Sequence, residues 1–228
     1  MKYLVPPEKP SQSILVGCLL AASGGLQDAY TYNVRDQVFA NAQTGNMVLV
    51  GQSLALGQWA VAVEHLIPVL AFAGGVFAAE VVHNRFHSRN LAFHWRQAVL
   101  LEAVILCLVA FLPLQLNLLA NGLVSFVCAM QVESFRKIEG NAYATTMCIG
   151  NLRSGMEHLY RWHVTREKAH LHRAKVYCLV ILVFVLGASL GGVACRSMGR
   201  YTILICCPLL LAAAALMAWI RRQGNGET

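Results

Sequence analysis

Long apolar runs separated by short polar links are the feature that most constrains what this chain can fold into. The 228 residues contain eight such segments, each close to the roughly 20 residues that a helix needs to cross a bilayer. Only 13% of the residues are charged, against about 25% in a typical soluble domain, and the mean hydropathy is +0.54. The sequence therefore predicts an all-α, polytopic membrane helix bundle that contacts the lipid bilayer.

The eight segments fall into two classes. Two of them, residues 38–56 and 141–160, are more polar than the rest and carry Asn, Thr and Gly among their apolar residues, which predicts two broken or re-entrant helices. The other six are predicted to span the membrane. These six segments are residues 13–31, 61–82, 95–114, 116–135, 176–195 and 201–220.

The order of the segments repeats once along the chain. Because each half would hold three spans, an odd number, the halves would insert in opposite orientations, as in the inverted repeats of many transporters. The predicted division is a first membrane repeat at residues 1–114 and a second at residues 115–228, within one integral membrane domain. Three short matches in the same order support it: Gln27 with Gln131, TGN at 44–46 with IGN at 149–151, and AFAGGV at 71–76 with ASLGGV at 188–193.

Positive charges between the segments predict the orientation of the chain. With six spans, four basic regions lie on one side, which the positive-inside rule makes the cytoplasm, and both termini lie there too. A seven-span version with an outside N-terminus also satisfies the rule and stays open, whereas eight spans violate it. Arg196 and Arg200 are exceptions to the six-span pattern. The four regions contain Arg85, Arg89 and Arg96; Arg136 and Lys137; Arg161, Arg166, Lys168, Arg173 and Lys175; and Arg221 and Arg222.

The polar residues of the two doubtful segments are the candidate site for substrate binding or a pore. A backbone that breaks inside a membrane must have its N–H and C=O groups satisfied by protein or water. Helix N-termini at that depth carry partial positive charge and can face an anion or a polar solute. The alternative is that these residues serve only helix packing and interhelical hydrogen bonds. They are Thr44, Gly45 and Asn46 in the first segment and Gly150 and Asn151 in the second.

Acids and amides within the predicted spans extend this candidate site. Asp28 follows Gln27, and Glu133 follows closely after Gln131, so each half places an acid near a matched glutamine. Glu102 lies near the centre of its own span. Ionisable groups within spans are costly, which makes these acids candidates for polar or proton-linked roles, with proton coupling assigned to Asp28 or Glu102. The alternative is a buried structural ion pair, for which the candidate cations are Arg35 and Arg153.

Other function classes have no support in the sequence. No nucleophile elbow, Walker loop, H-E-x-x-H or dinucleotide fingerprint occurs, so we expect no enzyme, no catalytic residue and no cofactor. The net charge of +7 lies between apolar runs, without a basic patch interleaved with aromatics, so we expect no nucleic-acid partner. The basic link with His163, His170 and His172 predicts a solvated loop and no metal site. Assembly into a homo-oligomer stays open.

Several stretches together resemble the YoaK-like family of small bacterial integral membrane proteins, a family also named for an uncharacterised domain. They are GGLQDAY, FANAQTGNMVLVG, FAGGVFAAEVV and, in the second half, Gln131 with ATTMCIGNL. The resemblance covers nearly the whole chain and implies about six spans in a bacterial inner (plasma) membrane, without supplying a substrate. It marks Gly25, Asp28, Phe39, Thr44, Gly45, Asn46, Gln131, Thr145, Thr146 and Gly150.

Two positions of the second half depart from the family pattern. Val132 stands where the family usually has Asn, and Ile149 stands where it usually has Thr. We therefore expect the second-half motif to be weakened in this chain.

The sequence as a whole predicts a small transporter or channel for a polar solute or ion. In the alternative, the chain is a non-transporting membrane scaffold or partner subunit whose polar residues only pack helices. Water access to the two Gly-Asn corners, at residues 45–46 and 150–151, distinguishes these interpretations, because a scaffold predicts dry corners. A membrane enzyme is a third and weaker interpretation, since no acids or bases gather at one membrane face.

Overall fold

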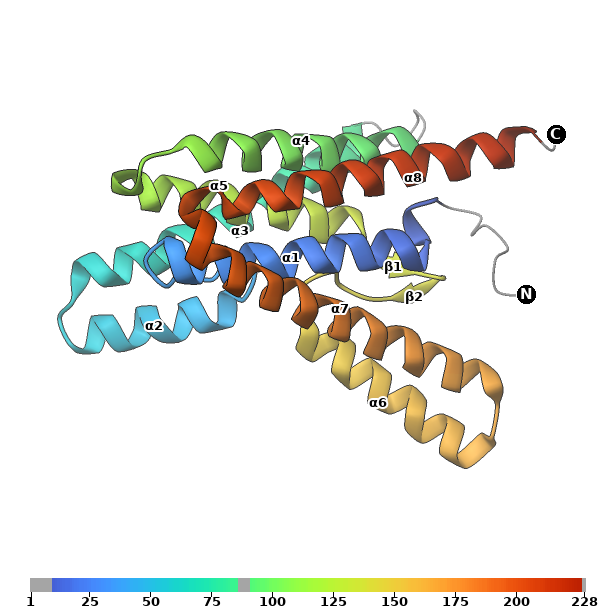
Figure 1. Ribbon diagram of the computed structural model, residues 1–228. Coiled ribbons are helices and arrows are strands. Elements are labelled where there is room, and N and C mark those ends of the chain that lie inside the picture. Colours follow the sequence, from blue (N-terminus) through green and yellow to red (C-terminus); the bar gives the residue numbers. More distant parts are fainter. Residues whose placement is uncertain (1–9, 86–90, 227–228) are drawn as a thin grey trace.

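The protein is a helical bundle with one small β-hairpin, which confirms the all-α prediction (Figure 1). The computed structural model describes residues 10–85 and 91–226, so Arg89 of the predicted basic link lies outside the described residues. The helices are α1 (Ile14–Val34), α2 (Gln43–Ala55), α3 (Trp59–Arg85), α4 (Leu91–Phe111), α5 (Asn117–Ser134), α6 (Cys148–Thr165), α7 (Lys168–Met198) and α8 (Cys206–Gly226). The shorter elements are η1 (Pro10–Gln12), η2 (Leu114–Leu116), η3 (Gly199–Ile205), β1 (Lys137–Ile138) and β2 (Asn141–Ala142).

Each helix of the first half packs mainly against a helix of the second half or against its own neighbour. Helix α1 lies along α7, and α5 lies along α3. Helices α2 and α6 pack on α3 and α7, the helices that follow them. Helix α4 packs on α8, while α4 also contacts α5 and α8 also contacts α1. The apolar core between these four helices is built mostly from small and branched residues such as Val99, Leu106, Val124, Leu210 and Ala213.

Three boundaries differ from the segments predicted from hydropathy. Helices α2 and α6 begin only at Gln43 and Cys148, because the residues before them form extended loops and, in the second half, the β-hairpin. Helix α7 begins at Lys168, so the basic segment predicted as a solvated loop is the first part of a helix. A two-residue link joins it to α6, and this α6–α7 hairpin projects from the bundle (Figure 1).

Three helical stretches of the described chain are long and apolar enough to cross a membrane: Trp59–Arg85, Leu114–Ser134 and Lys168–Gln223. The third comprises α7, η3 and α8. Helices α1 and α4 are not among them; α1 carries Ser, Gln, Asp and Thr on sides that are buried within the protein.

Apolar side chains on the outside of the bundle support contact with lipid. Ile149 on α6 is 81% exposed and Val48 on α2 is 63% exposed. Much of the apolar surface of α3 and α7 is exposed as well. In a water-soluble protein such a surface would be a large aggregation liability, whereas hydrocarbon chains solvate it without cost.

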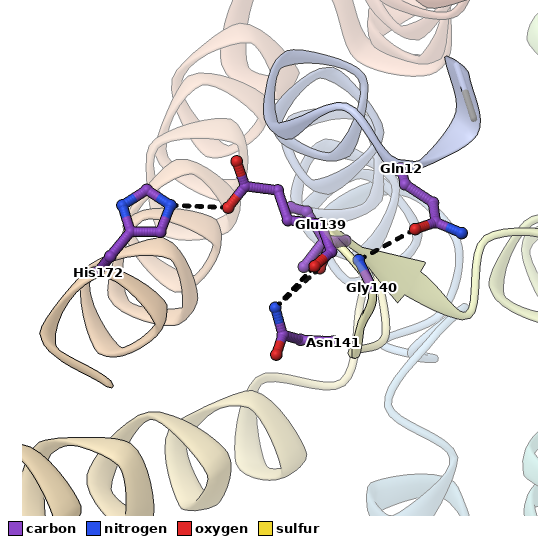
Figure 2. A network of polar contacts seen from close by, with 6 residues as sticks. Gln12, Glu139, Gly140, Asn141 and His172 are labelled. Atoms are coloured by element: carbon purple, nitrogen blue, oxygen red, sulfur yellow. Dashed lines mark hydrogen bonds and ion pairs between the residues drawn. The ribbon is translucent and has the colours of Figure 1, made fainter. Parts of the chain in front are cut away.

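The hairpin of β1 and β2 joins three parts of the chain at one end of the bundle (Figure 2). Its two turn residues, Glu139 and Gly140, have φ angles of 46° and 77°, as a two-residue hairpin turn requires. The amide of Gly140 donates to the side-chain oxygen of Gln12 at 3.0 Å, and Glu139 contacts the His172 ring at 2.7 Å. The side-chain nitrogen of Asn141 donates back to the Glu139 carbonyl at 3.0 Å.

Two glycines allow very close contacts between helices of the bundle. A Cβ atom at Gly187 of α7 would lie 2.1 Å from the carbonyl oxygen of Ala22 on α1. A Cβ atom at Gly75 of α3 would lie 2.2 Å from the carbonyl oxygen of Phe126 on α5. Small residues at such crossings let two backbones approach, which is the usual source of helix association in membranes.

Arg35, directly after α1, is fully buried and caps the C-terminal end of α4. A helix ends with carbonyl groups that have no partner within the helix, and a cation there also meets the negative end of the helix dipole. The guanidinium donates to the Tyr30 hydroxyl at 2.8 Å and to the Asn117 side-chain oxygen at 2.9 Å. It also donates to the carbonyls of Val109 at 3.0 Å, Leu112 at 3.0 Å and Pro113 at 3.2 Å.

Replacing the glycines at the helix crossings should destabilise the bundle. We expect Gly187→Ala and Gly75→Ala each to lower the free energy of unfolding by about 1–3 kcal/mol, because the added methyl meets backbone that must shift. Gly192→Ala and Gly74→Ala are matched controls in the same two helices, since a Cβ there has no atom closer than 3.9 Å. Thermal unfolding in detergent micelles measures all four, and equal loss in test and control variants would contradict this packing.

Arg35→Met should lower the free energy of unfolding more than removal of an exposed arginine does. The substitution leaves several buried carbonyl groups without donors, so we expect the free energy of unfolding to fall by at least about 2 kcal/mol. Arg153→Met on the exposed side of α6 is the control, with an expected change within about 0.5 kcal/mol. Comparable stability of the two variants in the same thermal unfolding measurement would rule out the capping role.

Candidate functional site

Asn46 closes the loop that leads into α2. Its side-chain oxygen accepts from the Phe39 amide at 3.2 Å, and its side-chain nitrogen donates to the Phe39 carbonyl at 2.7 Å. Asn46 is fully buried, so one side chain satisfies both main-chain groups of an extended residue inside the protein. Backbone that is buried away from water needs such internal partners.

Asn151 closes the loop before α6 in the same way. Its oxygen accepts from the Ala144 amide at 3.2 Å, and its nitrogen donates to the Ala144 carbonyl at 2.7 Å. The residues before the two helices, Ala42 and Met147, also have similar backbone angles, with φ and ψ of −83° and 66° in one and −91° and 79° in the other. Despite Ile149, the second loop therefore keeps the geometry of the first.

The two loops meet on α1 at Gly24. The side-chain nitrogen of Asn41, from the first loop, donates to the Gly24 carbonyl at 3.0 Å. A Cβ atom at Gly24 would lie 2.4 Å from the side-chain methyl of Thr146, which belongs to the second loop. One turn further along α1, Asp28 accepts a hydrogen bond from the Asn41 amide at 2.8 Å. Segments far apart in the chain thus converge on one face of α1.

A second group of polar side chains surrounds Glu102 of α4, which is 1% exposed. The side-chain nitrogen of Gln27 donates to Glu102 Oε1 at 2.8 Å and also contacts the Ser23 hydroxyl at 3.1 Å. The Gln131 amide, from α5, lies 2.9 Å from Glu102 Oε2 at one end and 2.9 Å from the Thr145 hydroxyl at the other. The two glutamines matched in the sequence therefore meet at one carboxyl group.

Three buried oxygen atoms in this region have no hydrogen-bond partner within the described chain. They are Gln27 Oε1, Asn41 Oδ1 and Thr146 Oγ1, and each side chain is more than nine-tenths buried. An oxygen without a partner in such a place costs free energy unless a water or a ligand supplies a donor. The arrangement can therefore accept hydrogen bonds from a small polar molecule or coordinate a cation.

The other predicted site residues lie further from this centre. Thr44 is exposed, and Gly45 packs against the Phe39 ring. Gly150 is exposed, with open space where a side chain would be. Glu133 pairs with Arg136, which also pairs with Glu80 on α3, so this acid belongs to an ion-pair cluster at the end of α5.

Asn41, Ser23 and Glu102 are as central to the site as the predicted residues. Glu102 was noted as a candidate for proton coupling, whereas Asn41 and Ser23 were not singled out. Asn41 stands 105 positions before Thr146, the same spacing as between Asn46 and Asn151, so the repeat itself could have indicated it. Ser23 is one turn before Gln27 on the same helix face and could have been found from that spacing.

The histidines do not form a metal centre in the part of the chain that the structure describes. No group of three His, Cys, Asp or Glu side chains is close enough there to hold an ion. The Nδ1 atoms of His158 and His170 lie 3.0 Å apart where α6 meets α7, and the rings stack. His163 is exposed, and His172 contacts Glu139 in the hairpin cluster of Figure 2.

Comparisons with known proteins agree with the membrane architecture. Residues 16–217 match the model of a family described as "Protein of unknown function (DUF1275)". The chain is also 24% identical over 208 residues to the UPF0700 transmembrane protein YoaK of Bacillus subtilis (strain 168), which covers 87% of this chain and 90% of that protein. No solved structure matches the chain. The family match extends over most of the sequence and includes every element of the candidate site. The chain is a multi-pass membrane protein that belongs to the DUF1275 family.

Proposed function

We propose that this protein is a small transporter or channel for a polar solute or ion in the inner membrane of a bacterium. One observation carries the proposal: two broken helices, each braced by an asparagine, meet on α1 beside a buried polar centre with unpartnered oxygen atoms. Transporters with inverted repeats place their sites where such broken helices meet near the middle of the membrane.

The contacts support two inverted repeats, residues 1–114 and 115–228. The pairing of α1 with α7 corresponds to that of α5 with α3, and the pairing of α2 with α3 corresponds to that of α6 with α7. The brace of Asn46 on Phe39 corresponds to that of Asn151 on Ala144 at a constant spacing of 105 residues. Helices α4 and α8 pack on each other, as the last helices of two halves related by a two-fold axis would.

The glycine crossings refine the alignment of the repeats. Gly187 approaches Ala22, and Gly75 approaches Phe126, which stands 104 positions after Ala22. The equivalent of Gly75 is thus Gly187, 112 positions later. Gly192, which the similar letters at 188–193 match with Gly75, has no atom within 4 Å of a Cβ at its position, so it does not take the place of Gly75.

The directions of the helices support six spans with two half-spanning helices. In Figure 1 the α2–α3 and α4–α5 turns lie at one end of the bundle, whereas the α6–α7 turn and the C-terminal end of α8 lie at the other. Helices α2 and α6 begin near the middle and run to opposite ends. The basic residues of the α6–α7 turn and of α8 then share the cytoplasmic side, with both termini.

The chemistry of the site favours a solute that donates hydrogen bonds or carries positive charge. Its unpartnered groups are two amide oxygens and one hydroxyl, and Asp28 and Glu102 supply carboxyl groups nearby. The N-terminal ends of α2 and α6 point toward this region with partial positive charge, which the two acids balance.

A non-transporting scaffold is the alternative function. In that case the polar centre would only fix the packing of α1, α4 and α5, and water would not reach it. The observation against this alternative is the set of buried oxygens without partners, since a purely structural network is stable only when its members are satisfied.

Accessibility of single cysteines to water tests the proposed function. In a cysteine-free background we expect Asn41→Cys and Thr146→Cys to react with a small membrane-impermeant thiol reagent in intact or inverted vesicles, because both positions would line a water path. Ala213→Cys, fully buried in the apolar core, is the dry control, and Gln58→Cys in the exposed α2–α3 link is the wet control.

The reaction rates decide between transporter and scaffold. Rates at the two loop positions well above that of Ala213→Cys would support the water path and justify solute uptake assays in proteoliposomes. If both positions stay as unreactive as Ala213→Cys while Gln58→Cys reacts, the centre is dry and the scaffold is the better account. Monodisperse elution from a sizing column establishes that each variant is folded.

A further inference from the structure

The protonation state of Glu102 decides the direction of the hydrogen bonds around it. Oε1 accepts from the Gln27 amide nitrogen at 2.8 Å. Oε2 lies 2.9 Å from one end of the Gln131 amide, whose other end lies 2.9 Å from the Thr145 hydroxyl. A side-chain amide has a donor at one end and an acceptor at the other, and its hydrogen-bond partners decide which way it faces.

A charged Glu102 permits one arrangement of this chain of hydrogen bonds. A carboxylate is an acceptor only, so Gln131 must turn its nitrogen toward Glu102, where it reaches Oε2 at 2.9 Å and Oε1 at 3.2 Å. The Gln131 oxygen then accepts from the Thr145 hydroxyl at 2.9 Å. The hydroxyl hydrogen of Thr145 is committed to Gln131 in this state.

A protonated Glu102 permits the reverse arrangement. The acid hydroxyl at Oε2 donates to the Gln131 oxygen, while Oε1, now the carbonyl oxygen, still accepts from Gln27. The Gln131 nitrogen then donates to the Thr145 oxygen at 2.9 Å, which frees the Thr145 hydrogen for another acceptor. In both arrangements the Glu102 carboxyl group and both ends of the Gln131 amide have partners, and only the oxygen and nitrogen of Gln131 exchange places.

We infer that Glu102 is a proton-binding site whose occupancy reverses the Gln131 amide and so changes the bonding of the loop before α6. One proton adds to the carboxylate, the amide turns by half a rotation, and no other covalent bond changes. The switch reaches the loop at Thr145, next to Ala144, which Asn151 braces, and to Thr146, which rests on Gly24.

The surroundings of Glu102 contain few other charges to compete for this role. Among the described residues, the titratable side chains near enough to interact with its charge are the thiols of Cys128 on α5 and of Cys206 and Cys207 on α8. Asp28 on α1 interacts with Cys128 as well, but it is bonded to the loop before α2. The hydrogen-bond partners of Glu102 among the described residues are the two glutamine amides.

This inference deepens the proposed function, because a transporter could use the proton on Glu102 as its coupling ion. Only the coupling of the proton to transport depends on the proposed function. Proton binding to Glu102 itself is measured without any solute. The proton site and the water path can therefore fail separately.

Infrared difference spectra recorded between acid and alkaline pH test proton binding in the reconstituted protein. A buried carboxylic acid gives a carbonyl stretching band that titrates and shifts in D₂O. We expect Glu102→Gln to remove one such band and Glu102→Asp to shift it, while Asp28→Asn and the ion-paired Glu133→Gln leave it in place. Survival of every titrating band in Glu102→Gln, or no titrating band in the wild type, would overturn the proposal.

Thiol labelling tests the relay through Gln131. In the Thr146→Cys protein we expect the labelling rate to change at least about fivefold across the infrared titration, the lower end of common coupling between sites. Gln131→Leu should keep the Glu102 band and abolish this pH dependence. If the pH dependence persists in Gln131→Leu, the relay is wrong. A titrating Glu102 band with no labelling at any pH would support the proton site and contradict the water path.

Discussion

Satisfaction of main-chain groups away from water is the constraint on which the rest of this structure depends. A helix interrupted in the hydrocarbon region leaves N–H and C=O groups that lipid cannot bond. Asn46 and Asn151 each supply one donor and one acceptor to a residue seven positions earlier, so both loops can stay inside the protein. Because these loops are held inside the protein, Asn41 and Thr146 reach Gly24 on α1. Their side-chain oxygens are left there without a partner.

The helices differ in where they carry polar and apolar side chains. The polar centre belongs to α1, α4 and α5, whose buried faces carry Ser, Gln, Asp and Glu, and these helices have close neighbours on several sides. Helices α3, α7 and α8 have high hydropathy, and most of their apolar windows is exposed on the outside of the protein. Glycines at the α1–α7 and α3–α5 crossings bring the backbones of these helices close together.

Local patterns in the sequence were sufficient for the helices and for part of the site. Apolar runs located every helix, and the spacing between the two Gly-Asn corners indicated two related loops. The partners of Glu102 were beyond such patterns, because Gln27 and Gln131 reach it from helices whose crossing is set by tertiary packing. Arg35 was considered a partner for Asp28, yet it lies on the carbonyl groups that end α4. The start of α7 was missed because a run of Lys, His and Arg has helix propensity without an apolar signal.

Helices of the first half of the chain pack on helices of the second half, so the order of synthesis matters for assembly. Helix α1 leaves the ribosome first, but the helix it packs along, α7, is synthesised more than a hundred residues later. Until then the face of α1 that carries Gly25 has no partner, although Asp28 and Arg35 already have theirs in the loop before α2 and in α4. Early membrane insertion must therefore hold α1 with one buried face uncovered, in or beside the translocation channel. The chain would reach its final arrangement only after α7 and α8 have inserted, which makes this late assembly the step most exposed to misfolding.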